Sequence, residues 1–497
     1  MILFLKKYLN ETFIFIILTT CYVYFFPRWA DPNQNSRLDM VVAIVDDQSF
    51  QIDKYVSNTV DYAKVGDHYY SDKAPGVALL GVPIYYGLKT FLNLPVMQQA
   101  VAKLSSNQAF LATLNPEGTG IFEQKLRFAI AQVIITFLIS ALPTALLGIL
   151  IYRSLLLFTD NPKSRLFVVF VYGLLTPAFV YANAFYGHQL SAVLLFIAFY
   201  FIFIQNRLFS IPKAIFLGFC LAYSVITEYP AFLVTILLFS VAAWRLLRSK
   251  QIKALALVTV TAGILAVLWM GYNTKIFGGP LSLGYSQSEL WQTQHHTGFM
   301  SLTFPHWDAF YGITFSAFRG LFYFSPILLL SFVGFYFWWK TKRHRDIWLL
   351  SLSSVTLIFI FNMSSSMWWG GYAVGPRYLL PMIPFLVLPL VFVFEKWLSN
   401  LWFKIISLVL ILWSLVTTWG LALAGQGYAP DTFKNPLVEY ALPNWLEGNI
   451  ARNIGTVIGI SGGLSLLLLV AILSIEAIAW FVINKRFEKS RKEILFV

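Results

Sequence analysis

Charged residues and cysteines are scarce in this 497-residue chain. Only 12% of the residues are charged, 58% are hydrophobic, and the mean hydropathy is +0.68. Such a composition excludes an ordinary soluble globular protein and an intrinsically disordered one. The two cysteines, Cys21 and Cys220, both lie in apolar stretches. Neither a disulfide framework nor a cysteine metal site is therefore indicated, and both are expected to be packing residues.

Two further features are missing. The first apolar segment follows Lys6 and Lys7 but runs into the sequence Phe25-Phe26-Pro27-Arg28-Trp29 without the small residues of a signal-peptide cleavage site, which favours an uncleaved anchor. The connections predicted below to be cytoplasmic contain no glycine-rich phosphate loop. A binding site for a soluble nucleotide sugar is therefore not indicated.

Apolar segments of about 20 residues, enough to cross a bilayer, recur throughout the chain. We therefore predict an all-α polytopic membrane protein that forms a single membrane domain over residues 1–497. Residues 77–94 are apolar but interrupted by Gly81, Pro83 and Gly87, and we predict an interfacial or re-entrant helix there. The twelve predicted spans are 8–26, 127–151, 166–184, 188–204, 213–227, 230–246, 254–273, 319–339, 346–362, 377–395, 402–422 and 455–483.

The distribution of charge supports this topology. With twelve spans and a cytoplasmic start, 22 of the 36 lysine and arginine residues lie inside, whereas 16 of the 23 acidic residues lie outside. This is the positive-inside pattern, and it would be inverted after residue 94 if 77–94 crossed the membrane. We predict a cell-membrane protein with both termini cytoplasmic and external loops at 27–126, 274–318 and 423–454. The membrane topology explains the excess of lysine and arginine over acidic residues, so nucleic acid is not an expected partner.

Residues 27–76 form a polar island with eight aspartates and no glutamate. Within it, residues 35–47 are predicted to form a short helix on the membrane surface, with Leu38, Val41, Val42 and Val45 on one apolar face. Asp39 shares a neighbouring stripe and would present its carboxylate to a cavity above the bilayer. The alternative is that the aspartates only solvate the outward face of this helix.

Basic residues recur at the outer ends of the apolar segments. Lys73 precedes Pro75 and Gly76, which fix a turn where an apolar segment begins. Its ammonium group can pair with a lipid phosphate, and the alternative is a lysine that only extends toward the head groups. Arg319 and Arg377 begin predicted spans and are either anchors or, with Lys73, a cradle for a phosphate.

Other polar and aromatic residues gather on the same predicted side. His188 and Glu228 are polar residues at membrane depth, where burying a polar group costs free energy, so they indicate either a functional site or a structural hydrogen bond. Tyr229, which follows Glu228, is a further candidate for substrate contact. The remaining candidates for substrate contact are His295, His296, Trp368, Trp369 and Tyr372, although both tryptophans fit the aromatic belt of a membrane protein. No histidine or aspartate group has a recognisable ligand spacing, so we predict neither a metal nor another cofactor.

Several short motifs together resemble a known family. They are Asn35-Ser36-Arg37, Tyr69-Tyr70-Ser71-Asp72-Lys73-Ala74-Pro75-Gly76, Tyr186-Gly187-His188, Trp368-Trp369-Gly370-Gly371-Tyr372 and Gly375-Pro376-Arg377-Tyr378. They are similar to the GT-C membrane glycosyltransferases, and most similar to the bacterial group of protein O-mannosyltransferases and the lipid A aminoarabinose transferase. In hydropathy the likeness covers most of the chain.

The resemblance implies a transferase that takes a sugar from a polyprenyl-phosphate donor on the external face and passes it, usually with inversion, to a hydroxyl of a glycan, lipid or protein. It matches Lys73 to the lysine associated with the donor phosphate and Arg37 to the arginine after an acidic pair. That pair falls here on Gln34 and Asn35. Asp39 is therefore our choice of general base, with Asp61 and Asp72 as substitutes. The alternatives are a flippase or transporter of lipid-linked saccharides and a ligase of lipid-linked polymers.

Overall fold

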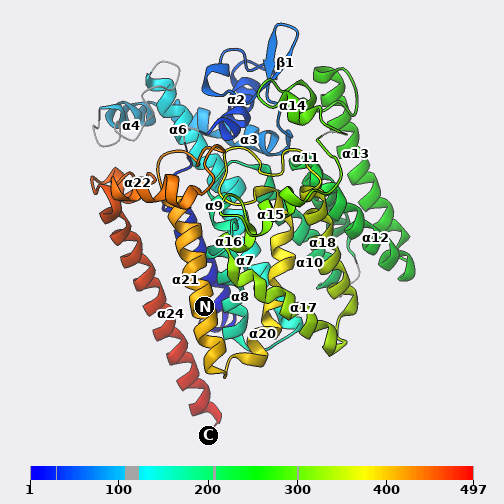
Figure 1. Cartoon of the computed structure of the whole chain (residues 1–497), viewed down its shortest axis with the longest axis vertical. Coiled ribbons are helices and arrows are strands. Elements are labelled where there is room, and N and C mark those ends of the chain that lie inside the picture. The colour runs from blue at the N-terminus through cyan, green and yellow to red at the C-terminus, as the bar shows by residue number, and fades with distance from the viewer. Residues whose placement is uncertain (1, 29–30, 107–121, 205–208, 299–300, 496–497) are drawn as a thin grey trace.

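The computed structural model describes residues 2–28, 31–106, 122–204, 209–298 and 301–495, and within these ranges the chain is mostly helical (Figure 1). The only strands described there are β1 (Ala63–Val65) and β2 (His68–Tyr70), which form one antiparallel hairpin. The predicted all-α class is thus confirmed. Residues 29–30 and 107–121 of the predicted loop 27–126 lie outside the described residues.

The longer helices follow the apolar segments of the sequence. Six described helical stretches are long and apolar enough to cross a membrane, or eight if each of two bent pairs is one span. The prediction of a multi-pass membrane protein is confirmed, whereas the count of twelve spans is not. The α-helices that fall on predicted spans include α1 (Ile2–Val23), α6 (Phe122–Thr136), α7 (Leu142–Ser154), α8 (Pro162–Leu174), α10 (Gly187–Phe203), α11 (Ile211–Thr227), α12 (Phe232–Arg248), α13 (Ile252–Phe277), α17 (Leu330–Thr341), α18 (Arg345–Met363), α21 (Leu401–Leu423) and α24 (Leu466–Leu495).

Shorter elements connect or interrupt the long helices. The short α-helices are α2 (Pro32–Asp46), α3 (Gly76–Leu92), α4 (Pro95–Ser105), α9 (Ala178–Ala182), α14 (Gln292–His295), α15 (Trp307–Thr314), α16 (Leu321–Phe324), α19 (Ile383–Val387), α20 (Leu390–Trp397), α22 (Leu442–Leu446) and α23 (Ile454–Val457). The 3-10 and π turns are η1 (Val56–Asn58), η2 (Phe137–Ala141), η3 (Leu155–Leu157), η4 (Tyr229–Ala231), η5 (Gly284–Gln287), η6 (Pro326–Leu329), η7 (Arg377–Met382), η8 (Leu437–Ala441) and η9 (Gly462–Ser465).

Prolines explain why several predicted spans are divided. The segment 319–339 becomes α16, η6 and α17, because Ser325 precedes Pro326 and adopts a non-helical φ of −138°. The segment 166–184 becomes α8 and α9, with the break before Pro177. Residues 77–94 fall on α3, which is followed by α4 after a bend of 91°. The interfacial or re-entrant placement of this segment stays a prediction.

The outermost helices carry apolar side chains on their open surface. In the most apolar windows of the α24 and α13 spans, only 6% and 11% of the residues are buried. These are the surfaces that a bilayer would cover, because exposed apolar side chains on a long helix are stable in lipid and not in water. In Figure 1, α24 stands at one edge of the bundle and α13 at the opposite edge.

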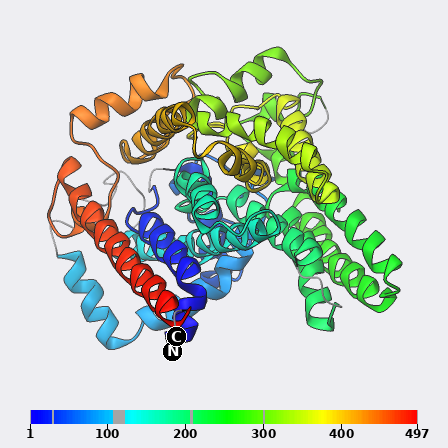
Figure 2. The same ribbon diagram turned by 90° about the horizontal axis from the view of Figure 1, so that it is seen from below.

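The polar elements gather at one end of this bundle. Figure 1 places α2, β1, α3 and α14 at the top, whereas the two chain ends lie in the lower half. Figure 2, seen from below, shows α1 and α24 side by side, in agreement with their direct packing. The predicted short helix is present as α2, but eleven of its fifteen residues are buried. Asp39 is fully buried and accepts a hydrogen bond from Asn58 of η1, so its access to a cavity stays a prediction.

Candidate functional site

Three charged side chains meet in the interior between the hairpin and α3. The Lys73 ammonium nitrogen lies 2.6 Å from a carboxylate oxygen of Asp61 and 3.1 Å from one of Asp72. All three residues are at most 6% exposed. Buried charges are found where they are paired, and each of these depends on the others for its charge. The sequence candidates Asp61, Asp72 and Lys73 are therefore brought together by the fold.

The backbone around Lys73 is held by close packing. The Ser71 hydroxyl lies 2.9 Å from the hydroxyl of Ser36 on α2. Gly76 begins α3, and a Cβ atom there would lie 2.7 Å from the backbone nitrogen of Thr227. Only glycine permits this approach between the start of α3 and the end of α11. The motif that ends in Pro75 and Gly76 thus fixes Lys73 against two other elements.

The two carboxylates have different protonation tendencies. Burial would raise the pKa of Asp61, but contact with Lys73, with Arg377 and Arg37 beyond it, lowers that pKa below its ordinary value. Burial and the neighbouring Asp61 carboxylate raise the pKa of Asp72 to about 6. Burial would lower the pKa of Lys73, but both aspartates raise it. Lys73 therefore stays charged, and Asp72 is the more basic of the two carboxylates.

Two guanidinium groups flank one tyrosine ring beside this cluster. The Arg37 guanidinium carbon lies 5.8 Å from the centre of the Tyr186 ring, and that of Arg377 lies 5.1 Å from it. The Nε atoms of both arginines are buried without a hydrogen-bond partner among the described residues. Since their charge also lowers the pKa of Asp61, both arginines lie within electrostatic range of the Asp61–Lys73 pair.

Asp31 is a site residue that sequence reasoning missed. It caps α2, accepting a hydrogen bond from the Asn33 backbone N–H at 3.0 Å. It also accepts one from the Tyr186 hydroxyl at 2.7 Å. Burial raises the pKa of Asp31, although these hydrogen bonds and Arg377 oppose the rise. An aspartate directly before a proline at a helix start is the cap signal that would have found it.

His188 and Glu228 form a second buried pair. The Nδ1 atom of His188 lies 3.1 Å from a carboxylate oxygen of Glu228. Burial raises the pKa of Glu228 to about 7, although Arg37, Arg377 and Lys73 oppose the rise. The His188 ring packs edge-on against the Tyr378 ring, with centroids 5.2 Å apart. The pair thus lies within electrostatic range of Arg37, Arg377 and Lys73.

Aromatic rings cover the other side of Lys73. Its ammonium nitrogen lies 5.7 Å from the centre of the Tyr285 ring, which in turn stacks on the His295 ring at 5.0 Å. The Nδ1 atom of His295 lies 3.0 Å from the Ser301 hydroxyl. Tyr229 packs edge-on against Tyr285, with centroids 5.8 Å apart. His295 and Tyr229 therefore reach the site through Tyr285, which the sequence did not single out.

Other predicted site residues lie at its margin. Arg319 donates hydrogen bonds to the carbonyls of Phe318, Trp369 and Gly371, so its donors hold the loop 369–371. The indole N–H of Trp369 donates to Asp431, and Trp368 packs against Phe318. Tyr372 is 40% exposed and His296 lies on the surface, where its Nε2 atom is 3.2 Å from the Ser286 carbonyl. None of these five side chains contacts the Asp61–Lys73–Asp72 cluster directly.

Asp39 stands apart from the basic groups. Its carboxylate accepts a hydrogen bond of 3.0 Å from Asn58. Burial raises its pKa well above the ordinary value, and the Asn58 hydrogen bond only partly opposes this. Asp72 lies 3.1 Å from the Lys73 ammonium, whereas Asp39 is bonded to the neutral Asn58 amide, so the geometry favours Asp72 over Asp39 as a proton acceptor beside the basic groups.

The arrangement can bind an anion and accept a proton. The Arg37 and Arg377 guanidinium groups and the Lys73 ammonium supply positive charge inside the protein, where it acts strongly on a bound phosphate. Asp72 lies 3.1 Å from Lys73, so a proton acceptor stands next to the anion-binding groups. Among the described residues, no three histidine, cysteine, aspartate or glutamate side chains gather as metal ligands. Independence from metal stays a prediction.

Comparisons with known proteins give a likeness among solved structures. No protein-family model matches the sequence, and no curated protein matches it. Among solved structures, the chain is similar to the crystal structure of ArnT from Cupriavidus metallidurans bound to undecaprenyl phosphate. The identity is 15% and the TM-score is 0.45, with 95% of this chain and 77% of that chain covered.

Proposed function

We propose that this protein is a membrane glycosyltransferase that moves a sugar from a polyprenyl-phosphate donor to an acceptor hydroxyl on the external face of the membrane. The observation that carries the proposal is the buried Asp61–Lys73–Asp72 cluster beside the guanidinium groups of Arg37 and Arg377. This cluster places positive groups that can bind a phosphate next to Asp72, a carboxylate whose pKa is raised. The sequence motifs resembling GT-C transferases fall on the same residues.

In this proposal the basic groups bind the donor. Lys73, Arg37 and Arg377 contact the phosphate that links the sugar to the lipid. As the bond between the anomeric carbon and the phosphate oxygen breaks, negative charge grows on the departing lipid phosphate. Fixed positive groups stabilise that charge without having to reorganise, which is the main electrostatic route to catalysis in a water-poor site.

Asp72 acts as the general base. The acceptor hydroxyl attacks the anomeric carbon on the face opposite to the phosphate, and its proton passes to the Asp72 carboxylate as the new bond forms. A pKa of about 6 suits this role, because the carboxylate is ionised at neutral pH and basic enough to take the proton. Asp61 keeps Lys73 charged and in place. One displacement of this kind inverts the anomeric centre.

Donor binding by an Arg377→Gln variant tests the assignment of the basic groups. The variant keeps a polar side chain of similar length but removes the charge, so affinity for a polyprenyl-phosphate sugar should fall about tenfold or more, as expected for a charge-assisted contact. Arg345→Gln is the matched control, since Arg345 is exposed at the start of α18. Unchanged affinity in Arg377→Gln would remove Arg377 from the donor site.

A further inference from the structure

Tyr186 lies between the first turn of α2 and the two arginines of the proposed donor site. Its side chain is fully buried, and it directly precedes Gly187, where α10 begins. The guanidinium carbons of Arg37 and Arg377 both lie over its ring, 5.8 Å and 5.1 Å from the ring centre. A guanidinium over an aromatic face is attracted to the negative charge of that face, so the ring helps to orient the group. Tyr186 is therefore a common support for both arginines.

Hydrogen bonds tie the Tyr186 segment to the start of α2. The Tyr186 hydroxyl donates to the Asp31 carboxylate at 2.7 Å. The backbone N–H of the preceding residue, Phe185, donates to the side-chain oxygen of Gln34 at 2.8 Å. The amide nitrogen of Gln34 in turn donates to Asp31 at 2.9 Å. Asp31 and Gln34 are both buried, so these bonds fix the hydroxyl and the backbone of the segment together.

A second tyrosine connects the Tyr186 ring to the segment that carries Arg377. The Tyr181 ring stacks on the Tyr186 ring, with centroids 5.4 Å apart and an angle of 29° between the planes. The Tyr181 hydroxyl donates to the Val374 carbonyl at 3.2 Å and accepts from the Val374 N–H at 3.1 Å. Val374 lies three residues before Arg377. The two tyrosines therefore link Asp31 to the backbone beside this arginine.

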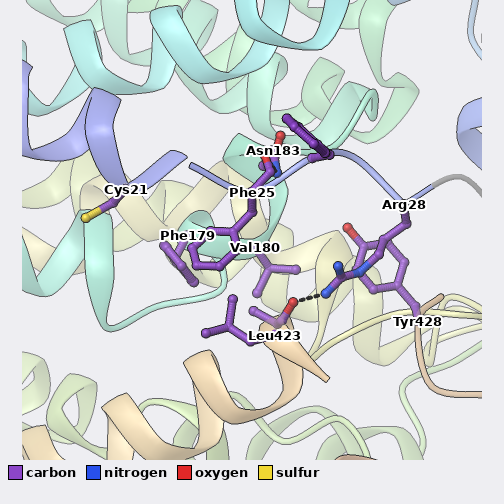
Figure 3. A pocket seen from close by; sticks show the side chains of 10 residues that line it. Cys21, Phe25, Arg28, Phe179, Val180, Asn183, Leu423 and Tyr428 are labelled. Carbon is purple, nitrogen blue, oxygen red and sulfur yellow. Dashed lines mark hydrogen bonds between the residues drawn. The ribbon is translucent and has the colours of Figure 1, made fainter. Parts of the chain in front are cut away.

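A third tyrosine packs against this pair. The centroid of the Tyr428 ring lies 6.2 Å from that of Tyr186 and 6.1 Å from that of Tyr181. Figure 3 shows Tyr428 beside Arg28, where both line a small pocket. Three buried rings in mutual contact leave the Tyr186 ring little room to move once its hydroxyl is held.

The first turn of α2 also holds Arg37. The Nη1 atom of Arg37 donates to the Asn33 carbonyl at 3.0 Å and to the side-chain oxygen of Asn33. The amide nitrogen of Asn33 donates to the Asp61 carboxylate at 3.4 Å, and Asp61 pairs with Lys73. One turn of helix thus joins Tyr186, Arg37 and the ion pair. A guanidinium held on one edge keeps its other donors available for a phosphate oxygen.

We propose that Tyr186 is a positioning residue for the donor phosphate. Asp31 holds its hydroxyl, and the ring so fixed orients Arg37 and Arg377. Gln34 serves the same arrangement by fixing the backbone next to Tyr186. Positive groups that are already ordered bind a phosphate without the free-energy cost of ordering them. This inference rests on the proposed function, because it concerns how the two donor-binding arginines are held.

Binding of a polyprenyl phosphate to the purified full chain in an uncharged detergent tests the proposal, with the corresponding polyprenol as comparison. Tyr186→Phe keeps the ring but loses the bond to Asp31. Affinity for the polyprenyl phosphate should therefore fall about tenfold, as expected for a hydrogen bond to a charged group, while affinity for the polyprenol stays unchanged. Because Tyr186 acts through the arginines, the double variant with Arg377→Gln should lose clearly less than the product of the two single losses.

Tyr22→Phe is the matched control, since the buried Tyr22 hydroxyl on α1 donates to the Gly173 carbonyl at 3.1 Å. It should lower the thermal midpoint but leave binding of the polyprenyl phosphate unchanged. Wild-type affinity in Tyr186→Phe, an equal loss in Tyr22→Phe, an equal loss for the polyprenol, or independent losses in the double variant would each overturn the positioning role alone. A wild-type protein that binds no polyprenyl phosphate would instead contradict the proposed function, and the inference with it.

Discussion

The Lys73 ammonium and the Asp61 carboxylate form a buried ion pair with 2.6 Å between the closest atoms and side chains that are 5% and 7% exposed. Burying two charges carries a large desolvation cost, so stabilising the fold does not by itself explain why this pair is buried. With Asp72 and two arginines next to it, the pair instead suits a ligand that brings its own negative charge.

Removal of Lys73 should affect both stability and binding. In Lys73→Met the carboxylates of Asp61 and Asp72 are left buried without their partner, which typically costs about 3 to 5 kcal/mol. Adding Asp61→Asn should recover part of that loss, because one uncompensated charge disappears. Donor affinity should stay low in both variants. Thermal unfolding in detergent and donor-lipid binding measure the two effects.

The control for Lys73 is Lys64→Met on β1, where the side chain is exposed. The Lys64→Met variant should change neither the stability of the protein nor its affinity for the donor. If Lys73→Met binds the donor as well as the wild type does, Lys73 is only an interfacial anchor.

The pH dependence of transfer should identify the base. If Asp72 accepts the proton, its carboxylate must be ionised, so the rate at saturating donor should fall about tenfold per pH unit below the pKa and level off above it. The Asp72 pKa of about 6 places the bend of the profile near pH 6. The Asp72→Asn variant should no longer show this fall in rate at acidic pH, and it should retain roughly 10⁻² to 10⁻⁴ of the wild-type rate. Initial rates from pH 5 to 8 provide the profile.

Asp39→Asn serves as the comparison in the same experiment. Its carboxyl group accepts a hydrogen bond from Asn58 and has no ion pair with a described residue, so its loss should leave the profile in place. A profile that survives in Asp72→Asn and disappears in Asp39→Asn would restore Asp39 as the base.

The sequence predicted the fold class and the charged motif better than it predicted the site. Lys73 was found because a lysine before Pro75 and Gly76 at the start of an apolar segment has few structural reasons to be there. Asp39 was preferred because the apolar residues of α2 define one face, and helical periodicity cannot reveal that η1 covers another. Tyr285 was not singled out, since aromatic residues are common in this chain, and Tyr186 entered only as part of the Tyr186-Gly187-His188 motif. Their role depends on long-range packing that brings α2, α10 and η5 together.

Gly187 should be essential for packing. A Cβ atom there would lie 2.3 Å from the Thr227 carbonyl oxygen and 2.5 Å from a Glu228 carboxylate oxygen, so Gly187→Ala forces backbone to move. A loss of about 1 to 3 kcal/mol is expected from such overpacking. Gly263→Ala on α13 is the control, because a Cβ atom there meets nothing within 4 Å. It should be neutral or slightly stabilising. Thermal midpoints of the two variants are compared, and equal midpoints would contradict the packing account.

Cysteine labelling tests which side of the membrane the elements occupy. A probe at Ser106, exposed just after α4, should react with an impermeant maleimide added outside, whereas one at Arg343 should not. Native Cys21 and Cys220 are buried and should contribute little background. The opposite labelling pattern would place the proposed site on the cytoplasmic side.

The most direct measurement is release of free polyprenyl phosphate from a radiolabelled polyprenyl-phosphate sugar by the purified protein in vesicles. Release in step with labelled acceptor, in the presence of a chelator, and its loss in Lys73→Met but not in Lys64→Met, is the result that the transferase account predicts. Transfer of the intact donor across the bilayer with no cleavage of the sugar–phosphate bond would contradict it and identify a flippase instead.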